Sequence, residues 1–265
     1  MGQPRSNIEW ESWAKADPLY GVASLEGRNK RGSNPWTEDE FYAYGAKVWG
    51  EYRNQWESYG VDRVNCVEIG CGAGRMTKQL SDYFQRVDAI DISCEMIKYA
   101  QLRVNSEKVS FHITDGLVLP LADSSATAAF SCDVFQHFDR ASFAENYFVE
   151  LFRVLTTGGS MMIHLPVYSW PDVMRRTFTA LYKLSKTANS LKAELRRVLL
   201  QRGFGSPFMF GIKYETKHLY NFLLQLGFRD IEIRFFENTG NGDLPDFRSY
   251  LFARKSVRLK VDSSS

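Results

Sequence analysis

Short apolar runs alternate with helical segments through the middle of the chain, and this alternation restricts the fold more than any other feature. Apolar runs of strand length lie at residues 64–69, 87–92, 109–113, 126–132 and 160–165. Helical patterns between them lie at residues 75–84, 95–104 and 141–155. Strands and helices alternating in this way form right-handed βαβ units, in which helices cover both faces of a parallel sheet. We therefore predict an α/β fold with a doubly wound, Rossmann-like sheet.

The C-terminal part of the chain adds one helix and two strands to this sheet. A helical pattern over 215–226 ends at Gly227. Apolar runs at 230–236 and 247–253 follow, joined by a link that contains two glycines and a proline. Such a link is typical of a hairpin connection. We expect these two strands to complete the sheet.

The N-terminal 60 residues are rich in aromatic side chains and precede the first predicted strand. Thr37 and Glu40 have the spacing of a capping box, which predicts a helix over 38–58. We expect residues 1–60 to form a helical cap and residues 61–265 to form the main domain.

Residues 167–217 form a strongly basic insert after the fifth predicted strand. They carry ten Lys and Arg and three Asp and Glu, an excess of seven positive charges in a chain whose net charge is +2. The pattern predicts helices. Three interpretations remain open: a solvated helical face, a lid over the substrate, or a docking face for an anionic partner. We favour a lid with a solvated outer face.

The composition argues against several classes of protein. The four cysteines form no C-x-x-C pair, and none lies beside a His at metal-ligand spacing, so we expect a reducing cytoplasm and no metal site. We find neither the apolar stretch of a signal peptide nor an apolar run of about 20 residues, so we expect no stable membrane insertion. The net charge shows no signature of nucleic-acid binding. A homodimer is compatible with the sequence.

A glycine-rich turn follows the first predicted strand. Gly70, Gly72 and Gly74 form a G-x-G-x-G pattern, which differs from the G-x-G-x-x-G of dinucleotide-binding turns. Glycines allow the backbone to turn tightly and to approach a ligand closely. Glu68, which leads into the turn, would oppose a pyrophosphate but suit a cationic ligand. The turn therefore predicts a site for a positively charged small molecule.

Three further carboxylates follow the next predicted strands, where a parallel sheet places its ligands. Asp91 ends the second strand and can accept hydrogen bonds from both hydroxyls of a ribose. Asp115 follows the third strand, where its side chain can accept an adenine amino proton. Asp133 follows the fourth strand. Chance agreement at all these strand ends is much less probable than agreement at one.

With these residues, the sequence resembles the class I S-adenosylmethionine-dependent methyltransferases over roughly residues 40–165, and more loosely over the C-terminal hairpin. The resemblance implies a seven-stranded sheet whose last strand is antiparallel. It also implies S-adenosyl-L-methionine as the cofactor. The cofactor-binding residues it implies are Glu68, Gly70, Cys71, Gly72, Gly74, Asp91, Ile92, Met96, Asp115, Gly116, Asp133 and Val134.

The resemblance also implies how these residues divide along the cofactor. Glu68 would lie near the ammonium group, and the turn from Gly70 to Gly72 would follow the methionine part. The second strand end would hold the ribose, with Ile92 and Met96 against the adenine faces and Asp115 with Gly116 at the adenine edge. The residues that would close over the sulfonium side are Asp133 and Val134.

Three residues are candidates for the reaction itself. His137 follows the fourth strand beside the expected transfer site, and a His of near-neutral pKa can remove a proton from the acceptor. Its alternative role is packing or capping of the next helix. His164 ends the fifth strand and would act as a substitute base or simply satisfy a backbone carbonyl. Tyr42 is the preferred substrate contact in the aromatic segment, although such aromatics are more often core residues.

The sequence therefore predicts an enzyme that transfers a methyl group to a hydroxyl, or an amine, of a small molecule such as a natural-product intermediate or a sugar. An oxygen acceptor is favoured because it needs a base more than a neutral amine does. The alternatives are a nucleic-acid or protein methyltransferase, a nicotinamide-dependent reductase, and a nucleotide-binding module without turnover. An Asn/Asp-Pro-Pro-Tyr signature is missing after the fourth strand, and no Tyr-x-x-x-Lys pair is found at the cleft, which disfavours the first two.

Overall fold

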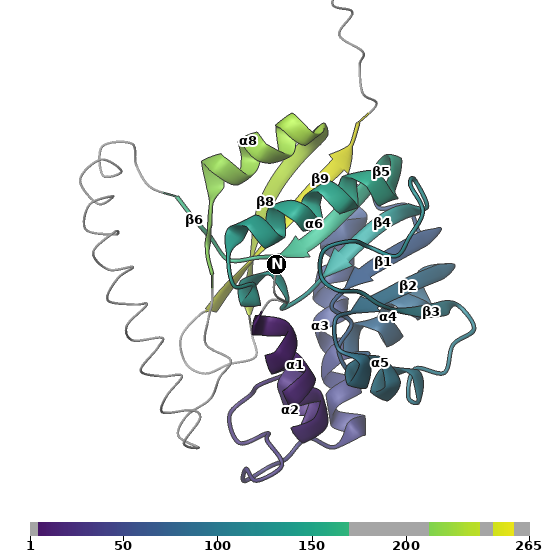
Figure 1. The fold of residues 1–265 in the computed structure, drawn as a ribbon, viewed down its shortest axis with the longest axis vertical. Coiled ribbons are helices and arrows are strands. Elements are labelled where there is room, and N and C mark those ends of the chain that lie inside the picture. Colours follow the sequence, from purple (N-terminus) through teal and green to yellow (C-terminus); the bar gives the residue numbers. More distant parts are fainter. Residues whose placement is uncertain (1–4, 170–211, 239–245, 257–265) are drawn as a thin grey trace, which may run out of the picture.

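A sheet of seven strands runs through the centre of the molecule (Figure 1). The computed structural model describes residues 5–169, 212–238 and 246–256. The strands of the sheet, in chain order, are β1 (Asn65–Ile69), β2 (Arg86–Asp91), β3 (Val109–Ile113), β4 (Ala126–Ser131), β5 (Leu155–His164), β8 (Phe228–Asn238) and β9 (Asp246–Lys255). They lie side by side in the order β3-β2-β1-β4-β5-β9-β8.

The strands β1 to β5 are parallel, and β9 runs antiparallel to both of its neighbours, β5 and β8. Parallel neighbours need a crossover, which the intervening helices supply, whereas a short link returns the chain antiparallel. The predicted seven-stranded sheet with an antiparallel last strand is therefore confirmed. The order reverses between β1 and β4, and a reversal of this kind opens a crevice at the carboxyl ends of the strands.

Helices cover both faces of the sheet (Figure 1). The helices α3 (Glu38–Tyr59), α4 (Arg75–Tyr83) and α5 (Cys94–Gln101) lie on one face. The helices α6 (Ala141–Val154) and α8 (Thr216–Leu226) lie on the other. Because both faces are covered, every side chain of β1 is buried, and burial does not alternate along the strand.

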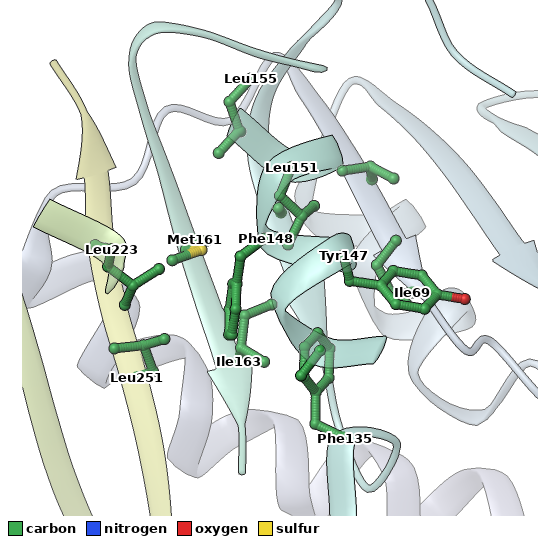
Figure 2. Close-up of a cluster of buried hydrophobic side chains, with 14 of the residues drawn as sticks. Ile69, Phe135, Tyr147, Phe148, Leu151, Leu155, Met161, Ile163, Leu223 and Leu251 are labelled. Atoms are coloured by element: carbon green, nitrogen blue, oxygen red, sulfur yellow. The ribbon is translucent and has the colours of Figure 1, made fainter. Parts of the chain in front are cut away.

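The face beneath α6 and α8 holds one of the hydrophobic clusters of the core (Figure 2). Phe148 and Leu151 of α6 are fully buried against the sheet, as are Met161 and Ile163 of β5 and Leu251 of β9. Full burial of an aliphatic or aromatic side chain stabilises a fold by roughly 1.5–3 kcal/mol. This packing holds β4, β5 and β9 at fixed positions, and with them the loops that follow β4 and β5.

The helix α3 packs its aromatic stripe against the opposite face. Thr37 and Glu40 form the expected capping box at its start, in which the Glu40 amide donates to the Thr37 hydroxyl and the Thr37 amide donates to the Glu40 carboxylate. Trp56 is fully buried, and its indole Nε1 donates a 3.2 Å hydrogen bond to Ser160 Oγ. Within the described ranges, no helix combines the length and the apolar character that crossing a bilayer requires.

Two further helices, α1 (Arg5–Ala16) and α2 (Pro18–Val22), precede α3 and lie across the carboxyl ends of the strands. Asn7 donates a hydrogen bond to the Asp115 carbonyl, and the Ser93 hydroxyl donates one of 2.6 Å to Glu11. These contacts attach α1 to the loops that follow β2 and β3.

The insert differs from the helical prediction at both of its ends. Val167–Tyr168 (β6) and Tyr214–Glu215 (β7) form a separate two-stranded parallel sheet. The pairing is extended by a hydrogen bond from the Tyr214 amide to the Pro166 carbonyl. Helical periodicity in the sequence gave no sign of strands as short as two residues. The lid expected between them concerns residues 170–211, which lie outside the described residues.

Candidate active site

A cavity of about 300 Å³ opens at the carboxyl ends of the parallel strands, at the crevice where the strand order reverses. Residues at the strand ends and in the loops after them form one part of its lining: Ile69, Gly70, Gly72, Ile90, Asp91, Ile92, Met96, Thr114, Gly116, Cys132, Asp133, Val134, Gln136 and His137. The remaining lining residues are Asn7, Trp10, Gly21, Val22, Ser24, Leu25, Phe138, Phe143, Tyr147 and Arg248.

The glycine turn forms a tight corner of this cavity. Gly70 and Gly72 have φ values of 73° and 51°, in the left-handed region that glycine adopts without strain. A Cβ at Gly70 would lie 2.3 Å from a methyl group of Val134, and a Cβ at Gly72 would lie 2.6 Å from a methyl group of Val22. Glycine at these two positions therefore lets the side chains of Val134 and Val22 pack directly against the backbone of the corner, beside the cavity that all four residues line.

Asp91 connects the end of β2 to this corner. Its carboxylate accepts hydrogen bonds from the amide of Gly72, at 2.8 Å, and from the amide of Ser93, at 2.9 Å. Burial raises the pKa of the Asp91 carboxyl, and the backbone hydrogen bonds oppose this effect. Each carboxylate oxygen has a second lone pair, so Asp91 can still accept hydrogen bonds from a ligand in the cavity.

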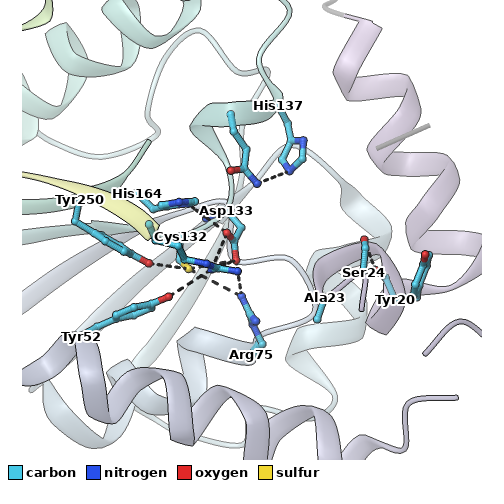
Figure 3. A network of polar contacts seen from close by, with 12 residues as sticks. Tyr20, Ala23, Ser24, Tyr52, Arg75, Cys132, Asp133, His137, His164 and Tyr250 are labelled. Atoms are coloured by element: carbon cyan, nitrogen blue, oxygen red, sulfur yellow. Dashed lines mark hydrogen bonds and ion pairs between the residues drawn. The ribbon is translucent and has the colours of Figure 1, made fainter. Parts of the chain in front are cut away.

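Asp133 is the centre of a buried polar network at the other end of the cavity (Figure 3). Its carboxylate lies 3.1 Å from Arg75 Nη2 and 3.0 Å from Arg248 Nη1, and 3.2 Å from Nδ1 of His164. Burial alone would raise the pKa of the Asp133 carboxyl, but Arg248, His164 and Arg75 outweigh it and hold that pKa well below its usual value. Asp133 is therefore ionised throughout the neutral range.

His137 lines the cavity from the short 3₁₀ turn after β4. Its ring packs edge-on against Trp10, with 5.2 Å between the ring centroids. Its Nε2 lies 3.1 Å from the side-chain amide nitrogen of Gln136, which can only donate. Burial lowers the pKa of His137 to about 4. The imidazole is therefore neutral at pH 7.

Comparison with known proteins identifies a family for this arrangement. A family model described as a methyltransferase domain matches residues 67–163. Phosphoethanolamine N-methyltransferase 2 of Caenorhabditis elegans is 35% identical over 101 residues, which are 37% of this chain and 22% of that protein. Malonyl-[acyl-carrier protein] O-methyltransferase of Bacillus cereus is 40% identical over 63 residues, 23% of either chain. The chain thus spans less than a quarter of the length of these two curated relatives.

Solved structures share the whole architecture. Magnesium protoporphyrin IX methyltransferase from Synechocystis PCC 6803, crystallised with bound S-adenosylhomocysteine, superposes with a TM-score of 0.57 at 13% identity. The match covers 95% of this chain and 100% of that one. Residues 67–163 match the methyltransferase domain family, and the fold is that of the class I S-adenosylmethionine-dependent methyltransferases. The matched region begins within β1 and ends within β5, so it includes the glycine corner and both aspartates described above.

Several residues predicted from the sequence do line the cavity. Most come from the ends of four strands or the loops after them, Met96 comes from α5, and the sheet order brings them together. The predicted residues in the lining are Gly70, Gly72, Asp91, Ile92, Met96, Gly116, Asp133, Val134 and His137.

Glu68 does not line the cavity. It is 2% exposed and accepts a 2.6 Å hydrogen bond from the hydroxyl of Thr77 in α4. Side chains alternate across a strand, so Val67 and Ile69 point towards α6 while Glu68 points towards α4. Burial raises the pKa of Glu68 to about 8, so its carboxyl is mostly protonated at neutral pH. The structure therefore places it beneath the glycine corner, not at the predicted ammonium contact.

Cys71 and Gly74 also lie behind the corner. The Cys71 side chain is buried in the cluster beneath α3 and α4. A Cβ at Gly74 would lie 2.7 Å from a methyl group of Val104. Gly74 therefore permits α4 and the segment after α5 to pack closely, and neither residue contributes to the lining of the cavity.

Asp115, Tyr42 and His164 are likewise outside the lining. Asp115 Oδ1 accepts hydrogen bonds from the amides of Leu117 and Val118 and so closes a turn. The Tyr42 hydroxyl donates a 2.9 Å hydrogen bond to the Ala73 carbonyl, which supports the glycine corner from behind. His164 is held between Asp133 and the ring of Tyr250. These three side chains have roles in the scaffold of the site.

Sequence reasoning missed several lining residues, of which Arg248, Trp10 and Gln136 are the most important for chemistry. A signal was present for Arg248, a charged residue in the otherwise apolar run 247–253. No comparable signal distinguished Trp10 from the other aromatics of the N-terminal segment. In the part of the chain that the structure describes, no group of three or more His, Cys, Asp or Glu residues is placed to hold a metal ion.

Proposed function

We propose that the chain binds S-adenosylmethionine in this cavity and transfers its methyl group to an oxygen of a small-molecule acceptor, with an amine as the second choice. The 2.8 Å hydrogen bond between the Gly72 amide and Asp91 carries this proposal. This bond joins the glycine corner, which a ligand can approach closely, to a carboxylate that can accept hydrogen bonds from ribose hydroxyls. A nucleoside needs both features.

The residues of the cavity suit the cofactor along its length. The corner at Gly70 and Gly72 would lie along the methionine part, and Asp91 would accept hydrogen bonds from the ribose. Ile92 and Met96 provide apolar contacts for the adenine. Asp91 favours the positive charge of the sulfonium compound electrostatically.

The transfer end of the cavity would supply orientation and exclude water. Bound S-adenosylmethionine supplies an activated methyl group, which moves to the nucleophile as the carbon–sulfur bond breaks and its electron pair remains on sulfur. Positioning two reactants in line accounts for much of the rate gain in such a reaction. His137 is neutral and can accept the proton that a hydroxyl loses, once the Gln136 amide has moved from Nε2.

Two relatives of known name support a small-molecule or carrier-bound acceptor. One is named for N-methylation of phosphoethanolamine and the other for O-methylation of a malonyl group on acyl-carrier protein. Of the proposed cap over residues 1–60, α1 and α2 would cover the cofactor, since Asn7, Trp10 and Val22 line the cavity from these two helices. A cytoplasmic location and a homodimer remain part of the proposal.

Isothermal titration calorimetry tests the cofactor assignment directly. S-Adenosylmethionine and S-adenosylhomocysteine should bind to the full chain, and NAD should not. Turnover is then tested by release of S-adenosylhomocysteine in a panel of hydroxyl and amine acceptors. No binding of S-adenosylmethionine at millimolar concentration would refute the proposal. Binding without turnover for any acceptor would favour a nucleotide-binding module.

A further inference from the structure

Arg248 contributes a guanidinium group to the far end of the cavity from Asp91. It belongs to β9, whereas Asp91 ends β2, and three strands lie between these two in the sheet. The pairing of His164 with Tyr250 shows that Arg248 lies two residues beyond the carboxyl end of β5. This is the edge of the sheet at which the cavity opens. Arg248 is the single Lys or Arg among the described residues that line the cavity.

The charges around Arg248 do not balance. Arg75 and Arg248 both contact the carboxylate of Asp133, so two guanidinium groups share one carboxylate. The second carboxylate of the lining, Asp91, is already hydrogen-bonded to Gly72 and Ser93 near the glycine corner. A partly buried guanidinium is costly unless an anion compensates it. Among the described residues, one positive charge at this end of the cavity is therefore left for a ligand.

Within the described part of the chain, partners are found for one of the three nitrogens of the guanidinium, Nη1. Nη1 of Arg248 lies within hydrogen-bond distance of both Asp133 oxygens, at 3.0 and 3.2 Å, and of the Tyr52 hydroxyl, at 3.4 Å. Nε and Nη2 have no partner among the described residues, and neither is among the fully buried atoms that lack one. An Arg presents its donors as a planar fork that fits the two oxygens of a carboxylate or phosphate.

We propose that Arg248 binds the methyl acceptor and that the acceptor carries an oxyanion, a carboxylate or a phosphomonoester. This inference rests on the proposed function and specifies the acceptor for the same cavity. The oxyanion accepts hydrogen bonds from the guanidinium edge that Asp133 leaves open. Arg75 and Asp133 hold Arg248 in place, because their ion pair fixes the carboxylate on which Nη1 rests.

The surroundings of Arg248 favour an anion over a neutral polar group. His137, which also lines this end of the cavity, has its pKa lowered by burial to about 4, so it adds no second positive charge at neutral pH. Recognition of the oxyanion therefore depends on a single side chain. Removal of that side chain should abolish the preference for anions without disturbing the cofactor end.

The experiment compares matched probes on protein saturated with S-adenosylhomocysteine. Hexanoate and hexyl phosphate are titrated by calorimetry, and hexanamide is the neutral counterpart of hexanoate. We expect at least one anion to bind about tenfold more tightly than hexanamide. The tighter anion tells whether the acceptor carries a carboxylate or a phosphomonoester. No binding of either anion up to about 50 mM, or equal affinity for hexanoate and hexanamide, overturns the proposal.

Variants then assign the effect to the side chain. Arg248→Met should reduce the affinity for the anion to that for hexanamide, and Arg248→Lys should retain part of the preference, because a point charge remains without the fork. Arg63→Met is the matched control, since Arg63 is half exposed and pairs with Glu57 far from the cavity. Unchanged anion affinity in Arg248→Met overturns the proposal. Thermal denaturation shows whether Arg248→Met is folded. If it is not, the anion preference of Arg248→Lys tests the proposal instead, and a preference equal to that of the unsubstituted protein overturns it.

A titration of the protein without nucleoside separates this inference from the proposed function. If the anions bind only without S-adenosylhomocysteine and are displaced by it, Arg248 holds the carboxylate of the cofactor, and the acceptor assignment is overturned. If S-adenosylhomocysteine does not bind at all, the proposed function fails. Arg248-dependent anion binding then still establishes the oxyanion site.

Discussion

The amide of Gly72 donates a 2.8 Å hydrogen bond to the carboxylate of Asp91, which joins the loop after β1 to the end of β2. The two residues are separated by 19 positions in the chain, yet a single hydrogen bond fixes their relative position. A ligand that contacts both therefore meets a site that is already organised. Preorganisation of this kind reduces the entropy that binding would otherwise lose.

Replacement of Asp91 by Asn should weaken binding of S-adenosylhomocysteine by about 10- to 100-fold, because a hydrogen bond to a charged group contributes roughly 1.5–3 kcal/mol. Calorimetry measures the change. Asp62→Asn is the control, because Asp62 is exposed in the loop before β1 and its side chain makes no described contact with the cavity. Equal loss in both variants would show that Asp91 has no specific role.

Replacement of Gly70 by Ala should destabilise the fold by about 2–4 kcal/mol and reduce cofactor binding. Two effects add: a positive φ, and a Cβ that would lie 2.3 Å from Val134. Gly158→Ala separates them, because Gly158 also has a positive φ, of 83°, but nothing lies within 4 Å of the added Cβ. Chemical denaturation should give a clearly smaller loss for Gly158→Ala. A similar loss in both would contradict the close contact with Val134.

His137 should make the reaction rate independent of pH between about pH 6 and pH 8, since its pKa of about 4 keeps the imidazole neutral there. The rate should fall only as the pH approaches that value. His137→Ala should lower kcat by about 10²-fold or more and remove the acid limb. Unchanged kcat in His137→Ala would assign the ring a packing role against Trp10.

Glu68 should make the free protein less stable as the pH rises from about 4.5 to 8. Its pKa is raised by burial to about 8 in the folded state, so the folded protein binds more protons than the unfolded chain in this interval. The stabilisation from the protonated carboxyl is thus fully present below about pH 4.5 and is lost as the pH rises through about 8. Glu68→Gln should remove this dependence and leave the protein more stable at pH 8 by on the order of a few kcal/mol. Denaturation curves of both proteins at pH 5 and pH 8 measure the free energy of unfolding. The same change with pH in the unsubstituted protein and in Glu68→Gln would refute the prediction.

The fold was largely predictable because its signals are local. Strand-length apolar runs and helical periodicity determine the elements, and the right-handed crossover rule then leaves few sheets to choose from. The glycine corner was predictable for a similar reason, since three glycines within five positions fit few other structures. The capping box of Thr37 and Glu40 is likewise contained in a few consecutive residues.

The details of the site were less predictable because they depend on contacts between distant elements. In β1 every residue is buried, so alternation could not show on which face Glu68 lies. Asp115 satisfies its own turn, which competes with any role towards a ligand. Arg248 reaches the cavity because β9 lies beside β5 in the sheet. These two strands are about 90 positions apart in the chain, so no local pattern in the sequence shows that they are neighbours.

The pairing of β6 with β7 has a consequence for how the chain can vary. Val167 lies opposite Tyr214, so β6 and β7 fix the two described segments on either side of residues 170–211 next to each other. We therefore expect substitutions within residues 170–211 to leave the central sheet and the nucleoside corner in place, because the pairing that positions both flanks lies outside that range.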